Sequence, residues 1–166
     1  MMSLVRLIAG LVLGSLGLTA FFLVLSALFP ERVARTRSAA EAYGGRSLVI
    51  GLVNLVFFGA IMLASFALNE QVGGGVLAIP GLGALALLTV GVVFGLAGVI
   101  RLLGERLAPG QPAVRRTAYG TLALAWAAAT PFIGWFLLLP YAAALGLGAF
   151  VLSFFYAALP EHVQPG

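Results

Sequence analysis

Long stretches of this chain carry no charged side chain, and its basic residues, all of them arginines, are gathered mainly into the short gaps between these stretches. The uncharged runs cover residues 7–30, 47–69, 71–100 and 117–160. A run of about 18 or more apolar residues is enough to cross the hydrocarbon core of a bilayer. We therefore expect the chain to cross a membrane several times.

The composition excludes several classes of function. With 62% hydrophobic and 8% charged residues, the chain has too few polar groups to cover a water-soluble fold. Its formal net charge of +4 comes from arginines beside apolar runs, which indicates membrane topology and anionic headgroups rather than a nucleic-acid partner. The absence of cysteine excludes disulfides and thiolate sites. Because no paired acids and no base beside a nucleophile stand out, we predict no enzyme and no catalytic, cofactor or metal site.

The pattern predicts an all-helical transmembrane bundle in a single domain, residues 1–166. A lead helix at about 4–29 ends at Pro30, and it is expected to be retained because its apolar stretch exceeds the roughly 7 to 15 residues of a signal peptide. A short interfacial helix follows at about 31–43. Two helical hairpins come next, with helices at about 47–68 and 80–103 and then at about 117–130 and 135–158. The 117–130 helix would reach roughly 21 Å against a core of roughly 30 Å, so it either crosses or re-enters, which gives four or five spans.

Orientation follows from two arginine-rich segments, because arginine-rich loops stay in the cytoplasm. The turn between residues 69 and 75 has only Glu70 as a charged residue, so it is expected on the opposite side. The C-terminus lies inside if the last hairpin crosses fully and outside if it re-enters. The two segments contain Arg32, Arg35, Arg37 and Arg46, and Arg101, Arg106, Arg115 and Arg116.

Two sets of glycines share one spacing and would each form a small-residue face that lets helix backbones approach closely. We expect the two faces to pack on each other within one molecule, with a dimer contact as the alternative. They are Gly10, Gly14 and Gly17 in the lead helix and Gly91, Gly95 and Gly98 in the 80–103 helix.

A weak P-x-x-G repeat at 80–83 and 131–134 suggests that the two hairpins are related, and its residues Pro80, Pro131 and Gly134 are predicted to break helices at hairpin tips. The alternative is an ion site on exposed backbone carbonyls, as in the discontinuous helices of transporters. Asn54 is the most polar residue deep in a span. We expect it to bond between helices, with substrate contact as the alternative.

Short motifs spread over nearly the whole chain resemble a known family. They read LFPERV at 28–33, GRSL at 45–48, IPG at 79–81, LGERL at 103–107 and PFIGW at 131–135. The chain resembles the uncharacterised hydrophobic domain of bacterial membrane proteins that is often found C-terminal to a polymer-forming, bactofilin-like β-helical region. The resemblance implies a bacterial cytoplasmic-membrane anchor or scaffold and carries over no catalytic residue.

Together these features predict a non-enzymatic structural, accessory or scaffold subunit that meets anionic lipid, a membrane-protein partner or a second copy of itself. The amphipathic 31–43 helix suggests where it does so, although its arginines could equally serve only to fix topology. The alternatives are a small oligomeric transporter or channel, and a subunit of a cofactor- or pigment-containing complex. The predicted lipid or partner face comprises Arg32, Arg35, Arg37 and Arg46.

Overall fold

The computed structural model describes residues 2–72, 75–130 and 132–155. Within these residues the chain forms α-helices and one π-helix and no strand, which confirms the all-helical class. The helices are α1 (Met2–Leu28), α2 (Pro30–Ala42), α3 (Gly44–Val72), α4 (Ala78–Leu107), α5 (Ala113–Ala128), the π-helix η1 (Ile133–Leu138) and α6 (Leu139–Phe155).

Four of the described helical segments are long and apolar enough to cross a bilayer, namely Ala9–Leu28, Gly44–Val72, Ala78–Leu107 and Ile133–Phe155. Most of their large side chains point outward. In water this surface would be unstable, whereas lipid tails solvate it without cost. The chain is therefore a multi-pass integral membrane protein. α5, with 16 residues, is not among the four segments.

The helix boundaries follow from local backbone chemistry. α1 stops before Pro30, which occupies the first turn of α2, where its missing N–H costs no hydrogen bond. α3 begins at Gly44, earlier than the predicted 47, because the Ser47 N–H already donates to the Tyr43 carbonyl at 2.8 Å. α4 begins at Ala78, so Pro80 lies inside its first turn and does not interrupt it.

The last helix is less regular than predicted. Its first turns form the π-helix η1, and α6 follows at Leu139. Pro140 has no N–H to return to the carbonyl of Phe136, which favours a wider turn just before it. Phe132, which precedes η1, has a φ of 67°, a conformation that residues other than glycine rarely adopt. Pro131 and residues 156–158 lie outside the described residues.

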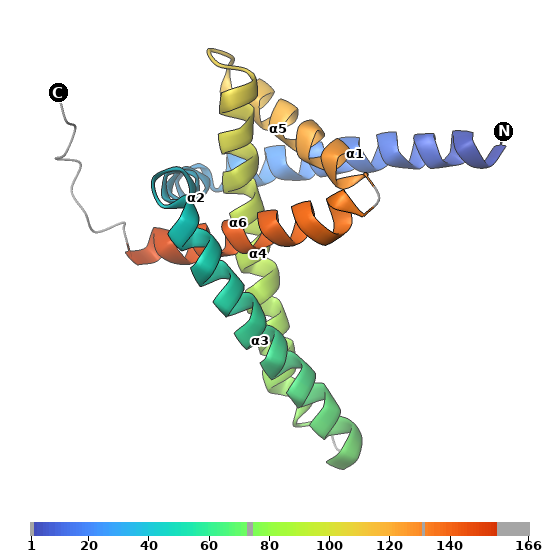
Figure 1. Ribbon diagram of the computed structural model, residues 1–166, viewed down its shortest axis with the longest axis vertical. Coiled ribbons are helices and arrows are strands. Elements are labelled where there is room, and N and C mark those ends of the chain that lie inside the picture. Colours follow the sequence, from blue (N-terminus) through green and yellow to red (C-terminus); the bar gives the residue numbers. More distant parts are fainter. Residues whose placement is uncertain (1, 73–74, 131, 156–166) are drawn as a thin grey trace.

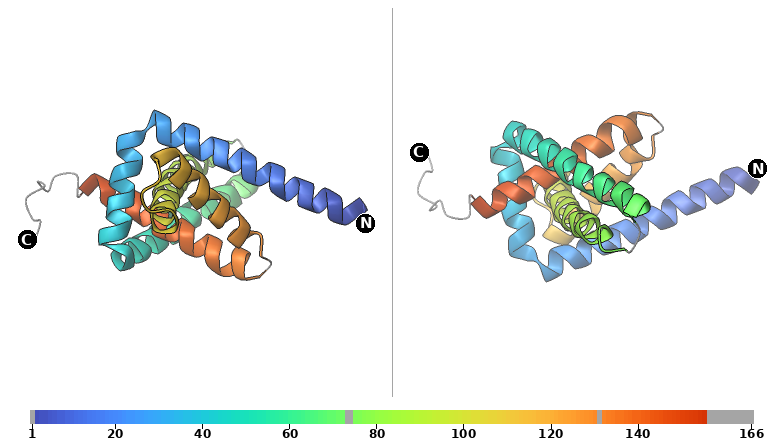
Figure 2. Two further views of the ribbon diagram at one scale, coloured as in Figure 1. Left: turned by 90° about the horizontal axis from the view of Figure 1, so that it is seen from above. Right: turned by 90° about the horizontal axis from the view of Figure 1, so that it is seen from below.

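α3 and α4 form a long hairpin, and α6 runs across it (Figure 1). Seen from above, α4 stands end-on at the centre, with α1, α2, α5 and α6 around it (Figure 2). α6 contacts α2, α3 and α4, while α1 packs mainly against α5. In the view of Figure 1, the α3–α4 hairpin extends to the bottom, whereas the N-terminal end of α1 lies at the right.

Candidate functional site

The glycines of α4 lie where other helices cross it. A Cβ added to Gly146 of α6 would lie 2.6 Å from the carbonyl carbon of Gly95, so these two helices touch backbone to backbone. At Gly98 an added Cβ would lie 2.7 Å from the Thr36 side chain of α2, and at Gly91 it would meet Leu147 of α6. The glycine stripe of α4, made of Gly91, Gly95 and Gly98, therefore packs against both α6 and α2.

The matching glycines of α1 have no such neighbour. An added Cβ at Gly10, Gly14 or Gly17 would find nothing within 4 Å. The expectation that the two stripes pack on each other within one molecule is wrong. The physical reason is that α2 and α6 already occupy the α4 stripe, so α1 is placed against α5 instead.

Two further helix crossings were not predicted from the sequence. α3 and α6 meet where Ser47 and Gly51 face Ala144 and Gly148, and an added Cβ on either glycine would overlap the opposite backbone. Both pairs have small residues four positions apart, the small-xxx-small signal of close helix packing, so the sequence did contain a signal for them. The other crossing joins α4 and α5, where Gly120 faces the backbone of Ile100.

The two arginine-rich segments meet around one carboxylate. Glu105 of α4 forms ion pairs with Arg37 of α2 at 2.6 Å, with Arg116 of α5 at 3.4 Å and with Arg101 of its own helix at 3.7 Å. The Glu105 side chain is only 18% exposed, so these charges attract each other through a partly water-free medium. Arg37 also pairs with Glu41 at 2.9 Å. Glu105 thus ties α2, α4 and α5 together at one end of the protein, which we call the arginine-rich end.

A ladder of aromatic rings fixes another arginine at this end. Phe94 of α4 contacts Phe29 at a centroid distance of 5.3 Å and stacks on Phe150 of α6 at 5.6 Å, and Phe150 in turn contacts Phe154. The Arg32 guanidinium lies 4.6 Å from the centre of the Phe154 ring, within the range of a cation–π interaction.

Not all four arginines of the predicted lipid or partner face are available to a partner. Arg37 is engaged inside the protein with Glu41 and Glu105. Arg35 pairs only with the highly exposed Glu31 at 3.5 Å, and Arg46 lies 5.9 Å from the ring centre of Tyr43. Both guanidinium groups are solvent-accessible and available to an anionic partner.

Several polar side chains within the apolar helices bond to the backbone of their own helix, whereas the buried Ser26 and Ser47 hydroxyls have no hydrogen-bond partner among the described residues. Asn54 donates to the Ile50 carbonyl of its own helix at 2.8 Å, so the expected bond to another helix is not the one formed. Thr19 and Thr121 donate in the same way to carbonyls four residues earlier. At the turn before α6, Gly134 is buried, and an added Cβ would lie 2.5 Å from the Ala128 carbonyl oxygen.

Residues 2–72, 75–130 and 132–155 contain no cluster of three or more histidine, cysteine or acidic side chains that could hold a metal ion. Comparison with protein-family models, with curated proteins and with solved structures gave no match.

Proposed function

We propose that this protein is a non-enzymatic scaffold or accessory subunit of the bacterial cytoplasmic membrane, which uses its arginine-rich end to dock a partner on the cytoplasmic side. The observation that carries the proposal is that the arginines differ in their partners within the protein. Arg37, Arg101 and Arg116 share the partly buried carboxylate of Glu105, whereas Arg35 pairs only with the highly exposed Glu31 and Arg46 lies against the Tyr43 ring.

The rigidity of the arginine-rich end supports this role. α2 is held at Arg37 by Glu105, at Thr36 by Gly98 and at Arg32 by Phe154. A short helix held at three points keeps its backbone in a fixed position on α4 and α6. A preformed backbone loses less conformational entropy on binding than an unfolded segment would, which favours recognition of a specific partner.

The packing of the apolar helices also supports the proposal. They close on one another through backbone contacts at Gly95, Gly146 and Gly148. The Thr19 and Thr121 hydroxyls and the Asn54 amide bond within their own helices. The part of the chain in the membrane is thus organised for packing. The resemblance to the hydrophobic domain of bactofilin-associated proteins implies an anchor or scaffold as well.

The test is site-specific photo-crosslinking in the native membrane. A photoreactive amino acid replaces Arg35, and in a matched control it replaces Leu63, an exposed residue of α3 far from the arginine-rich end. We expect a discrete protein adduct at position 35 and only lipid adducts at position 63. Recovery of lipid adducts alone at both positions would contradict a scaffold role.

A further inference from the structure

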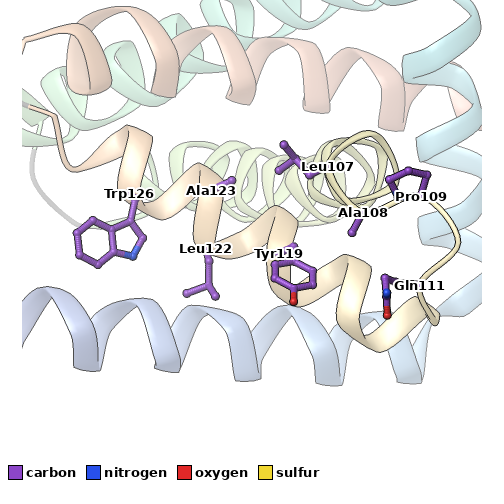
Figure 3. Close-up of a pocket in the computed structure, with 8 residues that line it drawn as sticks. All are labelled: Leu107, Ala108, Pro109, Gln111, Tyr119, Leu122, Ala123 and Trp126. Carbon is purple, nitrogen blue, oxygen red and sulfur yellow. The ribbon is translucent and has the colours of Figure 1, made fainter.

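A groove opens between the C-terminal end of α4, the following loop and α5 (Figure 3). Its volume is about 610 Å³, within the range of roughly 300 to 1,000 Å³ that is usual for pockets of small ligands. Leu107 and Pro109 line one side, and Tyr119, Leu122 and Trp126 of α5 line the other.

The groove is polar at one end and apolar along its length. Gln111 lies at the polar end, where its Oε1 accepts from Arg115 Nη1 at 3.1 Å. Arg106 is exposed next to the lining residue Leu107. The one carboxylate of this segment, Glu105, is already shared by three other arginines. The polar end therefore carries an excess of positive charge.

The stretch of α5 from Arg115, which bonds to the lining residue Gln111, to the lining residue Trp126 is about as long as one leaflet is thick. From Arg115 to Trp126 the rise along α5 is about 16 Å, and half of a hydrocarbon core of roughly 30 Å is about 15 Å. Tyr119, about one turn of α5 from Arg115, is about half exposed, and such an amphipathic ring favours the boundary between headgroups and acyl chains. A cationic end joined to an apolar groove of this length is complementary to an anionic phospholipid.

We infer that this groove binds one anionic phospholipid, with its phosphate at Arg115 and Gln111 and one acyl chain along α5 toward Trp126. The inference depends on membrane insertion and not on the scaffold role, since it involves neither Arg35 nor Arg46.

The two tryptophans of the chain provide a direct test. Trp126 lines the groove, whereas Trp135 lies on η1. In the Trp135→Phe variant all tryptophan fluorescence comes from Trp126, and in Trp126→Phe it all comes from Trp135. Each variant is reconstituted in phosphatidylcholine vesicles that contain either brominated phosphatidylglycerol or brominated phosphatidylcholine at equal mole fraction, and quenching by the bromine atoms is compared.

We expect phosphatidylglycerol to associate with Trp126 about fivefold more strongly than phosphatidylcholine, because an arginine at a membrane surface contributes attraction of that order. Trp135 should show no preference. Adding Arg115→Gln to the Trp135→Phe variant should abolish the preference, whereas adding Arg35→Gln, which removes the same charge at the same end, should preserve it. Circular dichroism checks that each variant is folded. Equal quenching of Trp126 by both lipids, or a preference that survives Arg115→Gln, would overturn the inference.

Discussion

The crossing of α4 and α6 makes Gly146→Ala the sharpest test of the fold. The new Cβ would lie 2.6 Å from the carbonyl carbon of Gly95 and 2.9 Å from both its oxygen and the nitrogen of Leu96. All three neighbours are backbone atoms, so no side chain can rotate away. The helices would have to separate by about 1 Å to restore an ordinary contact of 3.4 Å, losing the dispersion energy of the crossing.

Such overpacking typically costs 1 to 3 kcal/mol, so we expect Gly146→Ala to destabilise the protein by about 2 kcal/mol. Gly83→Ala is the matched control, because it makes the same chemical change on α4 with nothing within 4 Å of the new Cβ. There the higher helix propensity of alanine should stabilise by about 0.5 to 1 kcal/mol.

The assay is unfolding in mixed micelles with increasing mole fraction of dodecyl sulfate, followed by tryptophan fluorescence. The double variant Gly95→Ala/Gly146→Ala should lose less unfolding free energy than the sum of the losses in the two single variants, because one separation of the helices makes room for both methyl groups. If Gly146→Ala proved as stable as Gly83→Ala, the backbone contact between α4 and α6 would be refuted.

Three other measurements probe the arginine-rich end and the spans. Glu105→Gln should destabilise by about 1 to 3 kcal/mol in the same assay, because it removes a carboxylate shared by three arginines and leaves Arg101 and Arg116 without one. Glu31→Gln, at a highly exposed ion pair, should cost less than about 0.5 kcal/mol, and equal effects of the two changes would contradict the Glu105 cluster. Single cysteines at Ser38 and Glu70, both exposed, should be labelled by a membrane-impermeant maleimide from opposite sides, and labelling from one side would exclude the topology. Asn54→Leu should change the unfolding free energy by less than about 1 kcal/mol, because its amide bonds only to its own helix, and a larger loss would reveal a second partner.

The helices and their order could be predicted from the lengths of the uncharged runs and from the positions of Pro30 and the arginines, since each of these signals acts within a few residues. The fold class and the positions of most helix ends followed from them. The π-helix before Pro140 was missed because wider and normal helical turns differ little in their local residue preferences.

The glycine spacings show why the helix partners were less predictable. Gly14 and Gly95 belong to stripes with identical spacing, yet one faces no neighbour and the other touches Gly146. Lipid tails are as apolar as the helix surfaces, so hydrophobicity does not select which helices meet. The choice depends on how small residues on several helices fit at once.

The sequence by itself determined that the chain lies in a membrane, how its helices divide and that its positive charge gathers in two segments, because these properties depend on composition along the chain. Only the tertiary structure decided that Glu105 joins both segments, that Arg37 turns inward while Arg35 stays outside, and that α4 and α5 enclose a groove. These features arise where residues far apart in the chain meet, at positions set by the fit between helix backbones.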